Sequence, residues 1–285
     1  MPKLVGYFMR VLMLNYSDWG GGAAIAARRL QQGLLTRGID TQMLVRRRTR
    51  NDGALLSGNQ WTAGFVQRAR FVLDKMPLAL YPRRDRTPFS SQWLPDRLAH
   101  KINSWRPDLV HVHWIGHGYM HPSTLARLKA PIIWTLHDVW PFTGGCHVNL
   151  SCSRFQAHCG ACPRLGSNRQ RDLSQTAWRR KWKAWHARDM TLVAPSTWIA
   201  DCARKCSIFQ DSRIEVIPNG LDILRFQPTD RQEARARLNL PLDKKLVLFA
   251  GASRFQLPHK GFDLLKTALS GSQAARTFRN HVELI

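Results

Sequence analysis

The sequence is poor in acidic residues and lacks a long apolar run. Only 19 of its 285 residues are Asp or Glu, against 43 Lys and Arg, which gives a formal net charge of +24. No stretch approaches the roughly 20 consecutive apolar residues that a membrane-spanning helix needs, so we expect no span. The first residues also lack the apolar core and cleavage site of a signal peptide, which favours a cytoplasmic protein. The excess of positive charge indicates an anionic partner: nucleic acid, an acidic membrane surface or a phosphorylated substrate.

Short apolar runs alternate with helix-forming segments along the first 220 residues. The runs typical of buried strands are Gly6–Leu14, Thr41–Val45, Asp108–His113, Pro131–Leu136, Met190–Ala194 and Ile214–Ile217. Helical patterns are found at Ala23–Leu35, Leu98–Trp105, Pro122–Leu128 and Trp198–Cys206. The segment 46–95 is poorly periodic and predicts loops and broken helices. The alternation predicts an α/β fold with a doubly wound parallel sheet, in which ligands bind at the carboxyl ends of the strands.

The segment 221–285 forms a second, shorter unit. Its pattern predicts helices over Asp230–Leu238 and Gly261–Leu269, a strand over Lys245–Ala250 and the opening of another strand at Val282–Ile285. Its 65 residues (285 − 220) are fewer than the usual domain size of about 100–150 residues. We therefore expect residues 1–220 to form one Rossmann-like domain and residues 221–285 to be the incomplete beginning of a second.

A glycine turn separates the first predicted strand from the first predicted helix. Gly20, Gly21 and Gly22 allow close backbone approach, and the free N–H groups of the following helix attract anions. The turn is not a GxGxxG dinucleotide fingerprint, because no third glycine follows at the required spacing. The alternative is a tight turn that only joins the strand to the helix.

Histidines follow two of the predicted strands. His111, His113 and His117 lie on or after one strand, and His137 follows the next, beside Asp138. An HxH pair on a strand can bind a metal, although no acidic third ligand is evident. A His at the carboxyl edge of a strand can equally hydrogen-bond a substrate hydroxyl, or it can be a satisfied structural residue.

Four cysteines lie close together in the sequence, at Cys146, Cys152, Cys159 and Cys162. Disulfides are rare in a cytoplasmic protein, so the cluster predicts a structural zinc site, to which His147 or His158 could also contribute. Only the last pair has the tight CxxC spacing, and buried thiols without a metal are the alternative.

Three tryptophans recur at helical spacing within a basic segment. Trp178, Trp182 and Trp185 fall on one helical stripe, with Arg179, Arg180, Lys181 and Lys183 around it. A basic helix with an aromatic face suits a membrane interface. The alternative is a helix that packs this stripe on the core and leaves its basic face in solvent.

Two cations flank a strand-to-helix loop in the second unit. Arg254 follows the predicted strand, and Lys260 precedes the helix that opens at Gly261. An Arg and a Lys in such a loop can clamp a diphosphate. Surface cations near a helix start are the alternative.

The order of these motifs resembles a known family. Along the chain come the glycine turn, DLVHVHW, WTLHDVWPFTGGC, CGACP, APSTWIA, VIPNGLD and SRFQLPHKGFDLL. This set resembles the GT-B retaining glycosyltransferases of family 4, closest to bacterial exopolysaccharide, colanic-acid-type and O-antigen transferases. The resemblance implies that Gly21 and Gly22 face the donor phosphates and that His137 contacts the transferred sugar. It also implies that Arg254 and Lys260 neutralise the diphosphate leaving group, and that catalysis needs no divalent metal.

The resemblance implies a function and a location. We expect a hexose to be transferred from a nucleotide-sugar to a lipid-linked glycan in surface polysaccharide biosynthesis, at the inner face of the cell membrane. Family members carry a paired-glutamate motif further along the second domain, and the sequence stops before one. A weak or inactive transferase is therefore expected, and the alternative is a non-catalytic remnant that binds anionic membrane or glycan. Nucleic-acid binding is supported by charge alone and is not expected.

Overall fold

The chain forms two compact units, Met1–Gly220 and Leu221–Ile285. The computed structural model describes residues 9–49, 55–56, 63–250, 260–270 and 282–284. The two units are described separately below.

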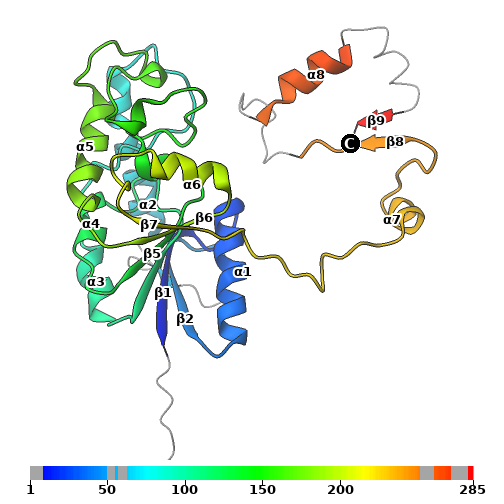
Figure 1. Ribbon diagram of the computed structural model, residues 1–285, viewed down its shortest axis with the longest axis horizontal. Coiled ribbons are helices and arrows are strands. Elements are labelled where there is room, and N and C mark those ends of the chain that lie inside the picture. Colours follow the sequence, from blue (N-terminus) through cyan, green and yellow to red (C-terminus); the bar gives the residue numbers. More distant parts are fainter. Residues whose placement is uncertain (1–8, 50–54, 57–62, 251–259, 271–281, 285) are drawn as a thin grey trace, which may run out of the picture. The chain divides into compact units, whose positions relative to one another are not determined.

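The first unit is built on a seven-stranded parallel sheet (Figure 1). The strands are β1 (Arg10–Ser17), β2 (Asp40–Arg47), β3 (Leu55–Leu56), β4 (Leu109–Val112), β5 (Ile132–Thr135), β6 (Thr191–Ala194) and β7 (Arg213–Val216). Their spatial order is β3-β2-β1-β4-β5-β6-β7, and every neighbouring pair is parallel. This confirms the predicted α/β fold with a doubly wound sheet.

Helices cover both faces of this sheet, as a parallel sheet requires. The helix α1 (Gly22–Thr36) covers one face, where Ala27 packs against Val11, Met13, Met43 and Val45. The opposite face carries α3 (Leu98–Ser104), α4 (Pro122–Ala126), α5 (Leu173–Trp185) and α6 (Thr197–Arg204), packed on the alternate residues of β1 and β4. The strand β1, which lies in the interior of the sheet, is therefore buried on both sides.

The segment between β2 and α3 is more regular than its sequence predicts. It contains the 13-residue helix α2 (Ala63–Lys75), the short helix η1 (Met76–Leu80) and then loops. Three further short helices, η2 (Trp140–Phe142), η3 (Arg154–Gln156) and η4 (Pro163–Leu165), lie between β5 and α5. The predicted strands and the helices near α1, α3, α4 and α6 match the structure to within a few residues at most described ends.

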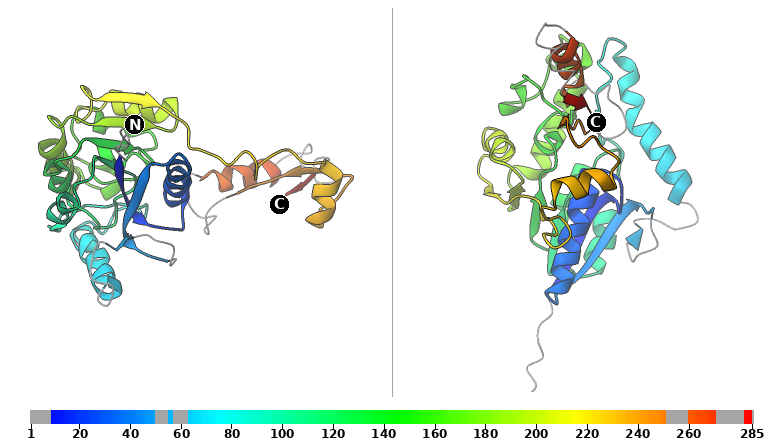
Figure 2. Two further views of the ribbon diagram at one scale, coloured as in Figure 1. Left: turned by 90° about the horizontal axis from the view of Figure 1, so that it is seen from below. Right: turned by 90° about the vertical axis from the view of Figure 1, so that its right-hand side faces the viewer.

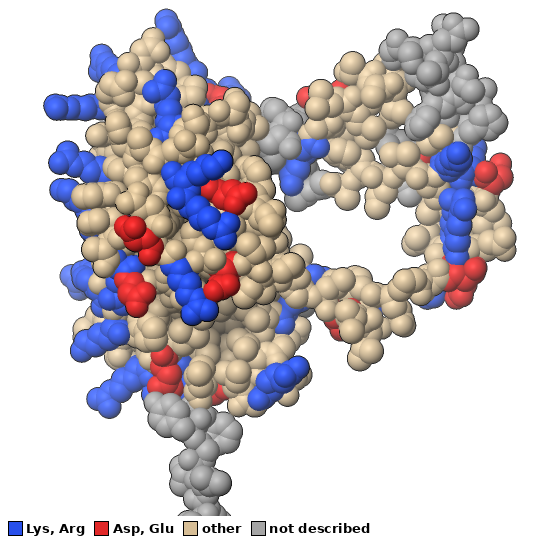
Figure 3. Space-filling view, viewed as in Figure 1, with Lys and Arg blue, Asp and Glu red and all other residues tan. Residues whose placement is uncertain are grey.

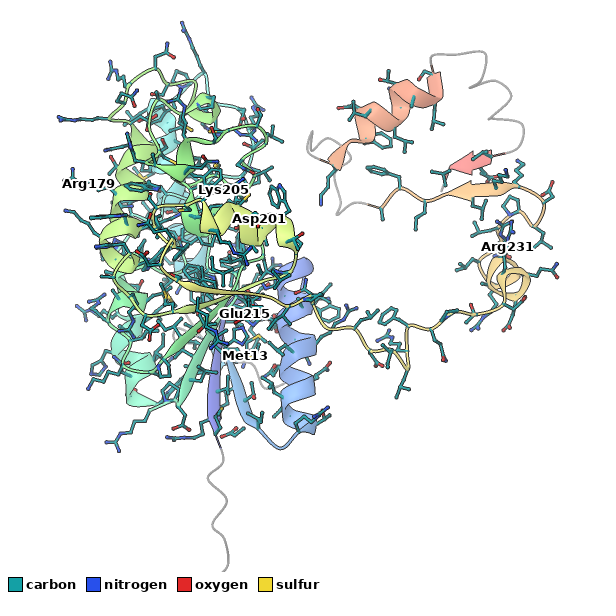
Figure 4. The ribbon with its side chains drawn as sticks, in the orientation of Figure 1. Met13, Arg179, Asp201, Lys205, Glu215 and Arg231 are labelled. Atoms are coloured by element: carbon teal, nitrogen blue, oxygen red, sulfur yellow. The ribbon has the colours of Figure 1, made fainter. Side chains whose placement is uncertain are left out.

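The tryptophan stripe of α5 faces the core. Trp178 and Trp185 are buried and Trp182 is half-buried, whereas Arg179 points away from the sheet (Figure 4). Of the two alternatives for this stripe, the structure shows the core-packed one, so the aromatic face that was predicted to meet a membrane is not available.

Lys181 is also buried, whereas the core-packed alternative placed the basic residues of this helix in solvent. Its ammonium donates hydrogen bonds to the carbonyl oxygens of Trp140 and Thr143 and lies 3.5 Å from the centroid of the Trp140 ring. Burial lowers the pKa of Lys181 to about 7. The buried amine thus joins α5 to the loop that follows β5.

The second unit contains α7 (Arg231–Arg237), β8 (Lys245–Val247), α8 (Phe262–Ser270) and β9 (Val282–Leu284). Asp230 caps α7 by accepting hydrogen bonds from the N–H groups of Gln232 and Glu233. The strands β8 and β9 pair in parallel, with Lys245 opposite Val282.

Within the described part of the chain, no helix has the length and apolar character needed to cross a membrane. On the face shown in Figure 3, Lys and Arg are spread along the first unit and project from its edge, with Asp and Glu between some of them.

Gly144 offers a test of the packing between α5 and the loop after β5. A Cβ atom at this position would lie 2.3 Å from the carbonyl oxygen of Ser174 in α5. We expect Gly144→Ala to lower the free energy of unfolding by about 1–3 kcal/mol, because the backbone must shift. The measurement is urea denaturation of both proteins.

Gly33→Ala is the matched control for this substitution. Gly33 lies inside α1 with open space around it, so alanine there should raise stability by up to about 1 kcal/mol. A Gly144→Ala protein as stable as the parent would show that this packing is looser than described.

Candidate functional site

A cavity of about 800 Å³ opens at the carboxyl ends of β1, β4 and β5. The chain passes from β1 to β2 on one side and, later, to β4 on the other, so the strand order reverses here. Ligands of doubly wound proteins bind at such a reversal point. The lining residues are Asn15, Tyr16, Ser17, Gly20, Gly21, Gly22, Ala23, Ala24, Arg47, Arg68, Phe71, Trp114, His117, His137, Asp138 and Asn219.

The glycine turn forms one wall of this cavity. Gly20 and Gly21 have φ values of 86° and 88°, in the region that favours glycine, and α1 begins at Gly22. No side chain caps this helix and its first turn holds no acid, so the N–H groups and the helix dipole are open to an anion. The space beside all three glycines is empty to 4 Å, which leaves room for a phosphate.

Three histidines form a stacked column that ends in the cavity. The ring of His111 on β4 is 4.5 Å from that of His113, which follows the strand, and the rings of His113 and His137 are 5.2 Å apart. His113 Nδ1 and His137 Nε2 share a hydrogen bond of 2.9 Å, and His111 Nε2 bonds the Thr135 hydroxyl at 2.8 Å.

Burial keeps these histidines neutral at pH 7. Desolvation lowers the pKa values of His111 and His137 to about 4, and it holds the pKa of His113 well below its usual value. His137 therefore presents an uncharged imidazole to the cavity, suited to hydrogen-bonding a hydroxyl rather than to carrying a charge.

Asp138 connects three parts of the cavity wall, and its carboxylate oxygens already accept several hydrogen bonds. Its carboxylate accepts hydrogen bonds from Trp114 Nε1 (2.6 Å), His147 Nδ1 (2.6 Å) and the N–H of Trp140 (2.9 Å). Burial alone would raise the pKa of Asp138, but His147 and these hydrogen bonds hold it below its usual value. We assign Asp138 to positioning, because its oxygens are already occupied.

An aromatic wall of the same cavity was not identified from the sequence. His117 lies 4.7 Å from Trp114, 5.1 Å from Phe71 and 5.5 Å from Tyr16 between ring centroids. His117 also has a left-handed φ of 56°, which is uncommon for a residue with a side chain. These rings come from β1, α2 and the loop after β4, so no local pattern marks them as one group.

Arg47 and Arg68 add positive charge to the same cavity. Arg47 ends β2 and therefore sits at the ligand-binding edge of the sheet, which its position in the sequence could have indicated. Arg68 lies on α2, in the segment for which the sequence predicted only loops and broken helices.

The model of glycosyltransferase family 4 matches residues 20–225 of this sequence. That segment is well over half of the chain and includes most of the cavity. The chain belongs to glycosyltransferase family 4.

Curated relatives of this family 4 chain match over shorter segments. A putative colanic acid biosynthesis glycosyl transferase, WcaC, of Escherichia coli K12 is 24% identical over 132 residues, which is 41% of this chain and 32% of that protein. A D-inositol 3-phosphate glycosyltransferase of a Nocardioides species is 49% identical over 59 residues, which is 21% of this chain and 12% of that protein. The matches thus span less than a third of the relatives' lengths.

Solved structures support the fold. WaaG, described as a glycosyltransferase involved in lipopolysaccharide biosynthesis, superposes with a TM-score of 0.52 at 13% identity, covering 96% of this chain and 62% of WaaG. At this identity the likeness shows the GT-B-like fold and nothing finer.

The cysteines of this family 4 chain gather away from the cavity. Cys146, Cys152, Cys159 and Cys162 all line a second cavity of about 20 Å³, and burial raises the pKa of Cys146 to about 12. Among the residues that the structure describes, no group of three or more His, Cys, Asp or Glu is placed to hold a metal ion. The zinc site predicted from the cysteine spacing and the metal alternative for the HxH pair stay predictions.

The cations predicted to bind the diphosphate belong to the second unit. Lys260 is exposed just before α8, and Arg254 lies outside the described residues. Gly21, Gly22 and His137 therefore share one cavity, while the part assigned to Arg254 and Lys260 stays a prediction.

The neutral histidines predict a loss of stability in mild acid. The unfolded chain takes up protons near pH 6.5, whereas folded His111 and His137 do so only near pH 4. The free energy of unfolding should therefore fall as the pH drops from 6.5 to 4, by on the order of 3 kcal/mol for each of the two. Urea denaturation at several pH values measures this.

Substitutions distinguish the contribution of the buried histidines to this pH dependence from that of other titrating groups. His111→Gln should reduce the fall, whereas His100→Gln, at an exposed position in α3, should leave it unchanged. Equal pH dependence in all three proteins would refute the assignment to the column.

Proposed function

We propose that this chain transfers a hexose from a nucleotide-sugar to a lipid-linked glycan in surface polysaccharide biosynthesis. The observation that carries the proposal is the convergence of the open glycine turn, the N-terminus of α1 and His137 on one cavity. Membership of family 4 and the similarity to a putative colanic acid glycosyl transferase support it.

In this proposal the glycine turn receives the donor diphosphate. The N–H groups of Gly22 and the residues after it are unpaired in the first turn of the helix, and they stabilise negative charge. During transfer the bond from the anomeric carbon to the diphosphate breaks, and charge builds up on the departing phosphate. Fixed donors and cations at that position lower the barrier most, because the charge is largest in the transition state.

His137 would orient the sugar. Its Nε2 is engaged with His113, so Nδ1 is the nitrogen left for a sugar hydroxyl. The acceptor hydroxyl forms the new glycosidic bond with the anomeric carbon, and its proton passes to an oxygen of the departing diphosphate. The aromatic wall of Tyr16, Phe71, Trp114 and His117 offers a surface for the apolar faces of the acceptor sugars.

For Lys260 and Arg254, the proposal rests on the resemblance to family 4. As cations they would offset the charge of the leaving diphosphate, so the reaction needs no divalent metal for that purpose.

The glycine turn gives a direct test of donor binding. Gly22→Ala should weaken binding of UDP or GDP at least 10-fold, because its methyl group occupies open space beside the helix N-terminus. Gly33→Ala, in the same helix but outside the cavity, should bind as the parent does. Isothermal titration of each protein measures the dissociation constants, and equal affinities would remove the turn from the donor site.

His137 gives a test of transfer. His137→Ala should lower the release of nucleoside diphosphate from the donor about 100-fold in the presence of a lipid-linked glycan extract, because a positioned polar group is lost. His137→Gln, which can keep a bond to His113, controls for stability, and His100→Gln controls for histidine loss in general. Unchanged turnover in His137→Ala would exclude this role.

Binding of a nucleotide by the parent protein without any transfer would instead favour the alternative, a non-catalytic protein that binds a glycan or a membrane.

A further inference from the structure

The helix α2 has its apolar side turned outward. Phe65, Val72 and Met76 recur at spacings of seven and four, which places them on one side, and they are 79%, 61% and 56% exposed. Val66 and Leu73 extend this side, and Leu80 at the end of η1 is 80% exposed. A surface helix normally buries its apolar side, whereas α2 exposes it.

Polar groups hold the opposite side of α2 to the first unit. Arg70 donates hydrogen bonds to the carbonyl oxygens of Gly118 (3.0 Å), Pro95 (2.9 Å) and Leu94 (3.2 Å). Asp74, one turn later, is buried and accepts a hydrogen bond from the Ser91 hydroxyl. These bonds fix the orientation of the helix, so the outward apolar stripe is a feature of the folded unit. Figure 2 shows α2, in cyan, at the flank of this unit.

Cations border the stripe. Lys75, Arg84 and Arg86 line an open cleft of about 350 Å³ at the end of the helix, and no acidic residue is among its described lining residues. Burial and then the nearby Arg84 lower the pKa of Lys75, while the buried Asp74 offsets part of this effect. Asp85, the acid between the two arginines, is bound to Arg164 at 2.6 Å.

We propose that this surface binds the face of a bilayer that contains anionic lipids. The surface, here the α2 face, consists of Phe65, Val66, Val72, Leu73, Met76 and Leu80 together with Lys75, Arg84 and Arg86. Its apolar side chains enter the boundary between headgroups and acyl chains, and its cations meet the lipid phosphates.

Charge favours a membrane over a second copy of the chain. Two copies joined through this face would bring Lys75, Arg84 and Arg86 of each close to the same cations of the other, which opposes association. An anionic bilayer supplies both an apolar phase and negative charge.

The α2 face also borders the candidate cavity. Arg68 and Phe71 belong to the same helix and line that cavity. This link to a lipid-linked acceptor rests on the proposed function, whereas binding to vesicles needs no sugar transfer, so the two proposals can fail separately.

Vesicle co-sedimentation of the full chain tests the proposal. The chain should bind phosphatidylcholine vesicles with about 30% phosphatidylglycerol more tightly than pure phosphatidylcholine vesicles, and less tightly as salt rises from about 0.05 to 0.5 M. The Phe65→Ser and Leu80→Ser pair should weaken binding at both salt concentrations. Replacing Lys75, Arg84 and Arg86 with Gln should weaken it about 100-fold at low salt and remove most of the salt dependence.

Matched controls carry the same changes elsewhere. Arg179→Gln with Lys183→Gln removes exposed charge from α5, and Leu35→Ser removes an exposed apolar side chain from α1. Both should bind as the parent does, and all variants should keep its thermal midpoint.

Three results would overturn the proposal. The first is the absence of any preference for anionic vesicles, and the second is an equal loss of binding in the controls. The third is a concentration-dependent dimer that only the Phe65→Ser and Leu80→Ser pair abolishes, which would assign the face to a second copy.

Discussion

The candidate site depends on the way Asn15 holds β1 and β4 together where these strands end. Its buried side chain accepts a hydrogen bond from the N–H of Trp114 (2.9 Å) and donates one to the carbonyl of Ser17 (2.6 Å). The backbone adds bonds from Tyr16 to Trp114 (2.7 Å) and from His113 to Leu14 (2.8 Å). Because both strands are fixed at this point, the glycine turn that follows β1 and the rings that follow β4 line the same cavity.

The site combines neutral side chains with charge from the backbone. The histidine column is uncharged at neutral pH, and Asp138 is occupied by Trp114, His147 and Trp140. Positive potential comes from the N-terminus of α1, Arg47 and Arg68. In such a site a diphosphate is stabilised by fixed dipoles and cations. A sugar, in contrast, forms hydrogen bonds with neutral side chains.

Two basic helices of the first unit place their apolar sides in opposite directions. In α5 the tryptophans pack on the core and Lys181 is buried over Trp140. In α2, by contrast, Arg70 and Asp74 bind the domain, and Phe65 and Val72 face outward. Both helices have periodic apolar residues with cations between them. The pattern shows that a helix has two sides, but the neighbouring carbonyl groups and rings decide which side is buried.

The sequence by itself determined the strands and their polar ends. Runs such as Pro131–Leu136 are apolar because parallel strands are buried on both faces, and this local signal predicted the sheet and placed Gly21, Gly22 and His137 at its carboxyl edge. The tertiary structure alone decided the aromatic wall, the burial of Lys181, the outward side of α2 and the arrangement of the cysteines around a small cavity. Tyr16, Phe71 and Trp114 are far apart in the chain and meet only through the strand order and the crossovers. Side-chain partners and burial arise from contacts between distant segments, and a local pattern does not contain that information.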